Sequence, residues 1–362
     1  PIISASLGAT ALGRGGNLSI SGDSLTLEDS AQLSTVTSVR QRDDDTSSDA
    51  GNVNINVRDF VMASGGSQIR SNTTGQGNAG NLSITAGNDV SLDGVAFLNG
   101  TLLPTGLGSS VRQDNPEAGL IGRGNAGNVF INTGDFSLTN GALIESATFS
   151  QGNAGNVTVN ASGDIELSGS PILMIPTSTA GQSVPVQQLS AIASSVSLGA
   201  AGQGGKIDIT ANNLRLQDGA QLFTATFGQQ SDTGLLSNGG NIDLDINNNV
   251  TLQDGALVDA RTGGEGNAGN IVLNAGGVVS LEGVGLVNGN LAQSSIVSQV
   301  ANFPQFQILG RGDGGDITIN ARTLEVIDGA SISASTFGQG NAGSVLLDIQ
   351  DGIVLTGFSA TR

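Results

Sequence analysis

The stretch GQGNAGNLSI, residues 75–84, decides the fold, because the chain repeats it along its whole length. It contains a glycine-rich turn, an anchor asparagine at position 81, and a short strand in which Leu82 and Ile84 alternate with polar residues. Alternation of period two indicates a strand with one buried face. A turn and strand that recur at intervals of this size are typical of a repeat architecture.

The turn and strand occur ten times, and each occurrence opens a repeat. The opening residues are Asn17, Asn52, Asn81, Asn128, Asn156, Lys206, Asn241, Asn270, Asp316 and Ser344. In the repeat that opens at Asn128, Phe136 and Leu138 indicate a second strand, and Asn140-Gly141 predicts a tight turn before a third strand. Three short strands in one repeat predict a triangular coil, in which each strand lies parallel to its equivalent in the next repeat.

The predicted fold class is therefore all-β, a right-handed parallel β-helix (β-solenoid) of about ten three-strand rungs and roughly 50 Å in length. A longer period lies above the repeat: Lys206 follows Asn17 by 189 residues, and Asn241 follows Asn52 by the same interval. We expect a single continuous solenoid over residues 1–362, with two super-repeats of five rungs. Residues 1–16 form a partial rung, 17–205 the first super-repeat, and 206–362 an incomplete second one.

Stacking places like residues above like residues, so the pattern predicts ladders. We expect a structural asparagine ladder of Asn17, Asn52, Asn81, Asn128, Asn156, Asn241 and Asn270. A threonine ladder is predicted at Thr37, Thr73, Thr148, Thr226, Thr262 and Thr336. The predicted core aliphatics are Val53, Leu82, Val129, Val157, Ile207, Ile242, Ile271, Ile317 and Val345.

Composition limits the possible functions. The net charge is −18 at pH 7, and the chain has no Cys, His, Trp or Tyr. Phosphate binding needs clustered Lys and Arg, so we expect no nucleic-acid partner. Thiol and imidazole ligands are absent, and no apolar run is long enough for a membrane helix. We expect no cofactor and no membrane insertion. The chain begins at Pro1 and ends within a repeat, so we also expect it to be a segment of a longer array.

Two short motifs could bind ligands, but for each of them a structural role is the stronger interpretation. Asp43 to Asp45, with Asp49, could hold Ca²⁺, which prefers six to eight oxygen ligands. The equivalent stretch in the second super-repeat has only Asp232, so a solvated acidic loop is the stronger interpretation. The tripeptide at residues 311–313 is Arg-Gly-Asp, but other repeats have Arg-Gly-Asn or Arg-Gly-Gly in the same turn.

A second candidate concerns catalysis, since polysaccharide lyases and hydrolases use β-helices. Asp208 and Asp243 should lie about one rung apart on an outer face, with Lys206 nearby and Asp245 further along the strand. However, aspartates alternating with aliphatics are also what a half-buried strand contains. We therefore predict no catalytic residues, no metal ligands and no enzymatic activity.

The motifs GQGNAGNLSITA, GRGNAGNVFINTGDFSLTNGALIESATFSQGNAGNVTVNA and GASISASTFGQGNAG resemble the repeat region of filamentous-haemagglutinin-like exoproteins. These are secreted by two-partner secretion systems, and the variety resembled is cyanobacterial. The resemblance covers essentially the whole chain. It implies an extracellular or cell-surface adhesin stalk or matrix fibre.

The expected function is a structural and adhesive rod of a large exoprotein. Expected partners are further repeats or other copies stacked end to end, and surface glycans or other cells. The alternatives are a self-stacking filament subunit of a surface layer or sheath, and a polysaccharide-active β-helix enzyme.

Overall fold

The computed structural model describes most of the chain. The described residues are 1–8, 11, 13–39, 48–98, 100–112, 122–176, 183–227, 237–303 and 309–357. Within these ranges every regular element is a β-strand, and the two large sheets are built from parallel pairs. The prediction of an all-β chain of parallel strands is confirmed. No helix in this part of the chain is long and apolar enough to cross a membrane.

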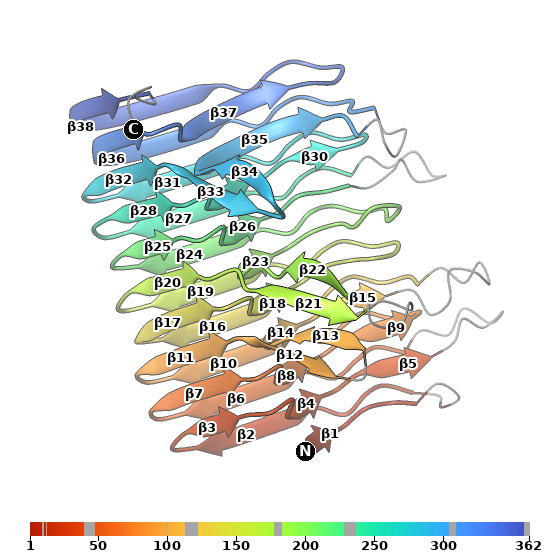
Figure 1. The fold of residues 1–362 in the computed structure, drawn as a ribbon. Helices are drawn as coiled ribbons and strands as arrows, with labels where there is room; N and C mark the ends of the chain where they lie inside the picture. Colours follow the sequence, from red (N-terminus) through yellow and green to blue (C-terminus); the bar gives the residue numbers. More distant parts are fainter. Residues whose placement is uncertain are drawn as a thin grey trace.

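The first strand of each repeat forms one continuous column. Each strand pairs in parallel with its equivalents in the adjacent repeats, and Figure 1 shows them stacked in chain order from the N-terminus to the C-terminus. The column is β2 (Leu18–Gly22), β6 (Val53–Val57), β10 (Leu82–Ala86), β16 (Val129–Thr133), β19 (Val157–Ala161), β24 (Ile207–Ala211), β27 (Ile242–Ile246), β31 (Ile271–Ala275), β36 (Ile317–Ile327) and β38 (Val345–Leu355).

The second strands form a parallel column within the same sheet, and β36 and β38 contribute their second halves to it. Its other members are β3 (Leu25–Leu27), β7 (Phe60–Ser64), β11 (Asp89–Asp93), β17 (Asp135–Thr139), β20 (Ile165–Ser168), β25 (Leu214–Leu216), β28 (Val250–Gln253) and β32 (Val278–Glu282).

The third strands form a separate parallel sheet, reached through tight turns. Asn140, Asp218, Asp254 and Asp328 have φ between 51° and 55° there, and each is followed by a glycine, as Asn-Gly and Asp-Gly turns require. The sheet contains β1 (Ile2–Ser4), β4 (Gln32–Ser34), β8 (Gln68–Arg70), β14 (Gly106–Gly108), β18 (Leu143–Glu145), β23 (Ala191–Ala193), β26 (Gln221–Phe223), β29 (Leu257–Asp259), β35 (Ser295–Ala301) and β37 (Ser331–Thr336).

Shorter strands follow the third strands in several repeats. They are β5 (Thr37–Val39), β9 (Thr73–Gly75), β15 (Val111–Arg112) and β30 (Thr262–Gly263). β9 pairs in parallel with β5 on one side and with β15 on the other, and β30 pairs with β35. The return path of each repeat is therefore also aligned with its neighbours.

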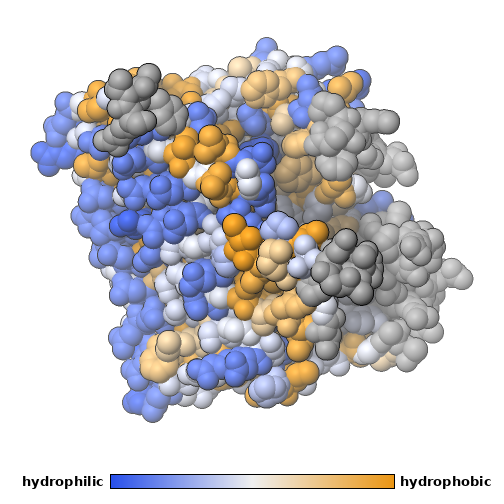
Figure 2. All heavy atoms as spheres, viewed as in Figure 1, coloured by the Kyte–Doolittle hydropathy of each residue, from blue (hydrophilic) through white to orange (hydrophobic). Residues whose placement is uncertain are grey.

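Three antiparallel hairpins interrupt this plan between the second and third strands. They are β12 (Val95–Leu98) with β13 (Thr101–Pro104), β21 (Ile172–Pro176) with β22 (Ser183–Gln187), and β33 (Val284–Val287) with β34 (Asn290–Gln293). They lie on one side of the stack (Figure 1), where Figure 2, in the same view, shows hydrophobic surface gathered. Gln187 joins two of them, since its Nε2 donates to Leu286 O at 3.0 Å.

The core is the space enclosed by the three columns. Val53, Leu82, Val129, Val157, Ile207, Ile242, Ile271 and Ile317 are register partners in sequence order, and each is at most 1% exposed. Val345 continues the column but is 44% exposed, so its assignment to the core was wrong. It lies on β38, which has a parallel neighbour on one side only among the described strands, so nothing in that part of the chain covers its other side.

Candidate functional site

The anchor residues form a hydrogen-bonded ladder on the surface. Asn81 Oδ1 accepts from the backbone N of Asn128 at 2.8 Å, and Asn128 Oδ1 accepts from the backbone N of Asn156 at 2.8 Å. The same bond links the anchors Asn17, Asn52 and Asn81 in turn, and later Asn241, Asn270, Asp316 and Ser344. Because these side chains are exposed, the ladder fixes the register at the surface and does not satisfy buried groups.

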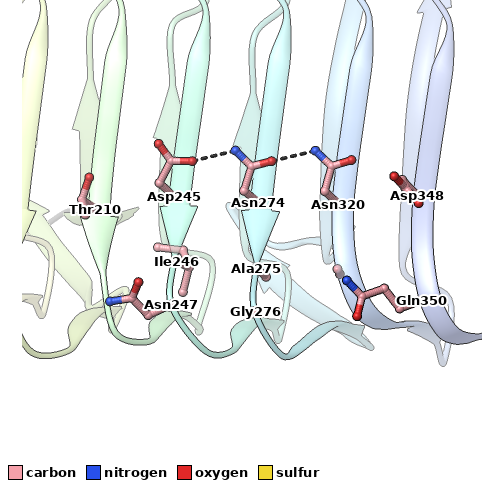
Figure 3. Close-up of a pocket in the computed structure, with 11 residues that line it drawn as sticks. Thr210, Asp245, Ile246, Asn247, Asn274, Ala275, Gly276, Asn320, Asp348 and Gln350 are labelled. Carbon is pink, nitrogen blue, oxygen red and sulfur yellow. Dashed lines mark hydrogen bonds between the residues drawn. The ribbon is translucent and has the colours of Figure 1, made fainter.

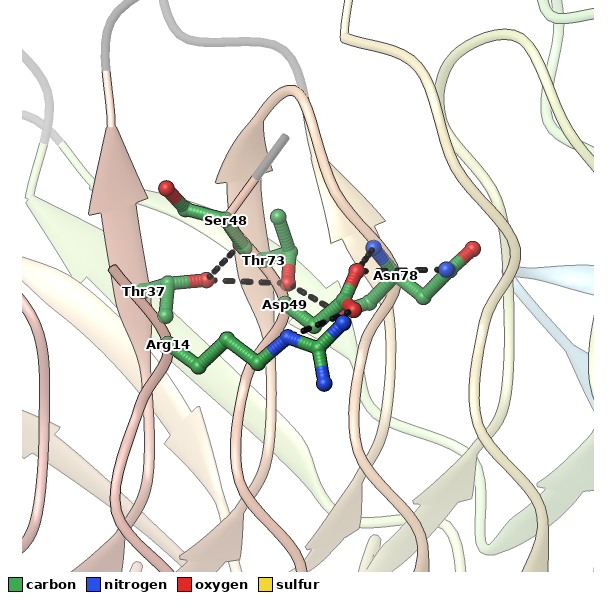
Figure 4. Close-up of polar contacts among 6 residues, drawn as sticks. All are labelled: Arg14, Thr37, Ser48, Asp49, Thr73 and Asn78. Carbon is green, nitrogen blue, oxygen red and sulfur yellow. Dashed lines mark hydrogen bonds and ion pairs between the residues drawn. The ribbon is translucent and has the colours of Figure 1, made fainter. Parts of the chain in front are cut away.

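A second ladder lies three residues before the first, and the sequence reasoning missed it. Asn78 Oδ1 accepts from Asn125 N at 2.8 Å, and Asn125 Oδ1 accepts from Asn153 N at 2.9 Å. Figure 4 shows its beginning, where Asp49 Oδ1 accepts from the backbone N of Asn78. The signal was present, because the repeated phrase Gly-Asn-Ala-Gly-Asn contains two asparagines three residues apart.

The Arg-Gly-Asp turn belongs to this second ladder. Asp313 N donates to Asn267 Oδ1 at 2.9 Å, and Asp313 Oδ1 accepts from Asn341 N at 2.7 Å. The carboxylate of Asp313 therefore occupies the place that an asparagine amide takes in other repeats.

A buried column of hydroxyl groups, also missed, closes the repeats. In each case a serine or threonine donates its hydroxyl hydrogen to the carbonyl of the glycine that precedes an anchor. This residue directly follows the third strand, except in β35, where Ser298 lies inside the strand. Ser109 Oγ bonds Gly80 O at 2.7 Å, and Ser146 Oγ bonds Gly127 O at 2.7 Å. Equivalent bonds come from Thr35, Ser71, Ser194, Thr224 and Ser298, and all seven hydroxyl residues are 0% exposed. A buried hydroxyl needs such a partner, so this column joins the third side of the stack to the start of the first.

The predicted threonine ladder is broken into short groups. Thr37 and Thr73 hydroxyl oxygens lie 3.0 Å apart (Figure 4), as do those of Thr226 and Thr262. Between the groups the column contains valine: Val111 lies between Thr73 and Thr148, Val196 between Thr148 and Thr226, and Val300 between Thr262 and Thr336. The six predicted threonines therefore share one column with three valines, because a valine has the same shape and fills the column equally well.

Asp208 and Asp243 are register partners on adjacent strands, as their spacing suggested. Lys206 Nζ lies 2.5 Å from Asp208 Oδ1 and 2.6 Å from Asp243 Oδ2. Burial alone would lower the pKa of Lys206, but the hydrogen bonds and charges of the two aspartates raise it. The two carboxylates share one ammonium group, which is an ion-pair arrangement on the outer face of the first strands.

Further along the same face a row of polar side chains lines a shallow hollow of about 420 Å³. Figure 3 shows Asp245, Asn274 and Asn320 in line, joined by amide hydrogen bonds: Asn274 Nδ2 donates to Asp245 Oδ1 at 2.6 Å, and Asn320 Nδ2 donates to Asn274 Oδ1 at 2.7 Å. The side chains use their donors on one another, so the row is a structural ladder of the exposed face.

The part of the chain that the structure describes offers no candidate metal site. The residues that the structure describes contain no group of three or more His, Cys, Asp or Glu side chains placed to hold a metal ion. Asp43 to Asp45, the proposed Ca²⁺ loop, lie outside the described residues.

Comparison with known proteins adds no relative: no family model, no curated protein and no solved structure matches the chain.

Proposed function

We propose that the chain is a structural and adhesive rod, folded as a right-handed parallel β-helix of about ten three-strand rungs in two super-repeats. In this proposal it belongs to a secreted or surface-exposed exoprotein of the filamentous-haemagglutinin-like kind, works outside the cell, and catalyses no reaction. The observation that carries the proposal is the first-strand column, in which parallel register partners continue from Leu18 to Val345.

This column supports a mechanical role. The backbone hydrogen bonds of every parallel strand pair run along the stacking direction. Extending the rod therefore requires breaking all the backbone bonds of a repeat together. The two side-chain ladders and the buried hydroxyl column add bonds in the same direction or close each repeat on itself. An adhesin stalk or a matrix fibre needs such resistance, because it transmits force between its ends.

Single-molecule pulling tests the proposal. The chain is held at its two ends and extended in buffer. A rod of stacked repeats should unfold in steps that release whole repeats, and a 28-residue repeat releases roughly 90–100 Å of chain. Continuous extension at low force, without steps, would exclude the load-bearing role.

Electron microscopy separates the rod from the filament subunit. Single particles of roughly 50 Å in length support a rod made of one chain. Long fibres that grow from purified short chains support the self-stacking alternative instead.

A further inference from the structure

The third-strand sheet has a groove where one strand lacks outward side chains. In β14 the inward residue Leu107 is buried, while the two residues on either side of it are Gly106 and Gly108. The neighbouring strands have Gln68 and Arg70 at these register positions on one side, and Leu143 and Glu145 on the other. The hollow has a volume of about 440 Å³. Its two walls are two strand spacings apart, about 10 Å.

The first hairpin closes one end of the groove. Thr101 and Pro104 of β13 line it there, and Arg112, Asn72 and Thr74 line the opposite end. The groove therefore runs across the stack, between the hairpin and the return strands. It is open to solvent along its length and is lined by both aliphatic and polar groups.

Arg70 is the unusual residue of this groove. No described residue gives its guanidinium group a hydrogen bond or an ion pair. Burial and the charge of Arg112 lower the pKa of Arg70, and the charge of Glu145 opposes this effect. Arg70 is half-buried, so its guanidinium group has five donors without a partner among the described residues, and these are open to an acceptor in the groove.

The neighbouring charges do not supply that acceptor. Glu145 Oε2 accepts from Arg112 at 2.7 Å and from Ser110 Oγ at 3.2 Å. Arg112 also lies over the ring of Phe149, with its guanidinium carbon 4.6 Å from the ring centroid. Glu145 and Arg112 are thus held by each other and by their neighbours, and Arg70 remains without a partner.

Gln68 gives a second, independent indication of a ligand. Its side chain lines the groove and is only 6% exposed, and its Nε2 donates to Pro104 O at 3.1 Å. Its Oε1 is buried without a hydrogen-bond partner in the described part of the chain. The wall of the groove thus contains an acceptor that has no described partner, close to the free donors of Arg70.

An equivalent hollow 189 residues later provides a contrast. It lies beside the third hairpin and is lined by Gln221, Leu257 and Arg261. There the position equivalent to Arg70 is Asp259, and this buried carboxylate is paired, since its Oδ2 lies 2.5 Å from Arg261 Nε. The same architecture therefore exists without an arginine at this position, so the fold does not require the unpaired Arg70.

We propose that the groove over Gly106 and Gly108 binds an acidic saccharide, with a uronic-acid carboxylate on Arg70 and sugar hydroxyl groups on the Gln68 and Asn72 side chains. A carboxylate matches the planar fork of a guanidinium group. A saccharide supplies hydroxyl groups for the Gln68 side chain and for Asn72 Nδ2, since Asn72 Oδ1 already accepts from Ser110 N at 2.9 Å. Its ring faces can lie on the aliphatic wall of Leu102 and Leu103. The chain otherwise repels anions with its charge of −18, so an acid sugar should bind at this place and not along the whole surface.

This inference rests on the adhesive part of the proposed function and names its ligand class. The test is an isothermal calorimetric titration of the full chain with a galacturonic acid trisaccharide. We expect saturable binding to the wild type that weakens as salt is added, and no binding of the neutral galactose trisaccharide. Equal binding of the neutral sugar, or no binding of the acidic one, would overturn the proposal. Acetate is the third probe: if it displaces the trisaccharide at equal concentration, the site recognises any carboxylate, and the saccharide assignment is wrong.

Two variants locate the site. Arg70→Gln should weaken binding at least about tenfold, because the charged contact is lost. Gly108→Leu should weaken it by filling the groove while leaving every charge in place, and the space above Gly108 accepts a Cβ, with Asn72 Oδ1 the nearest atom at 3.5 Å. Arg215→Gln, which removes an exposed arginine of β25 far from the groove, is the matched control and should bind as the wild type does. Unchanged binding in both groove variants contradicts the proposal, whereas the pulling experiment reports on the rod independently.

Discussion

Asn81 Oδ1 accepts a hydrogen bond of 2.8 Å from the backbone N of Asn128, although the two residues are 47 positions apart in the chain. The equivalent bond from Asn128 to Asn156 spans only 28 positions and has the same length. The contact between repeats is therefore independent of how much chain lies between the anchors. The additional residues of the longer repeat include the β12–β13 hairpin, which lies outside the three columns.

Replacing Asn81 with alanine should lower the free energy of unfolding by about 0.5–1 kcal/mol, because the Asn81 side chain makes one exposed ladder bond and the variant loses it. Thermal unfolding followed by circular dichroism measures the change. Asn54→Ala is the matched control, since Asn54 is an exposed asparagine of the preceding repeat whose side chain makes no hydrogen bond within the described chain. An equal effect of both variants would mean that the ladder bond contributes nothing.

Replacing Val157 with aspartate should lower the free energy of unfolding by several kcal/mol, on the order of 3–5, because a carboxylate would be buried without a partner. Val157 is 0% exposed and lies between Val129 and Ile207 in the core column. Asn160→Asp, on the outer face of the same strand, should change the stability little. Chemical denaturation gives both values, and a small effect at Val157 would be inconsistent with a dry core.

Gly127→Ala should destabilise the chain by about 1–3 kcal/mol through steric overlap. A Cβ atom at Gly127 would lie 2.2 Å from Gly80 O and 2.7 Å from Ser109 Oγ, so the repeats would have to separate locally. Gly22→Ala is the control, because the nearest atom to its added Cβ is 3.9 Å away. If the two melting temperatures fall equally, the close stacking of the glycine turns is not what limits this position.

The buried Asp259 should make stability depend on pH. Burial raises its pKa, while the charge and hydrogen bonds of Arg261 act against the rise. A carboxyl group whose pKa is higher in the folded protein binds more protons when folded, so it lowers stability as the pH rises from about 3.9 through the folded pKa. In Asp259→Asn this fall should be absent. Urea unfolding of both proteins at several pH values tests it, and identical pH profiles would show that Asp259 titrates equally in both states.

The sequence predicted the columns because the alternation and the anchor phrase identify which residues are equivalent. Val157 could be assigned to a buried position from its parity alone. Other features depend on the neighbours of a residue in three dimensions. Val345 has the same parity as Val157 and is exposed, because no described strand covers its other side.

The hydroxyl column and the groove were not predicted, for two physical reasons. Ser109 and Ser146 resemble any surface serine in the sequence, and only the position of the glycine carbonyls in the next turn shows that they are buried and bonded. The groove arises from side chains that Gly106 and Gly108 do not have. Its chemistry depends on Arg70, whose lack of a partner in the described chain is a property of the folded neighbours and not of the local sequence.

The spread of repeat lengths, from 28 to 50 residues between ladder partners, has a consequence for how such a molecule can change over time. Each repeat advances the stack by one strand spacing, whatever its length. Insertions at the hairpin positions can therefore change the surface without changing the length of the stack. Only the gain or loss of entire repeats changes that length.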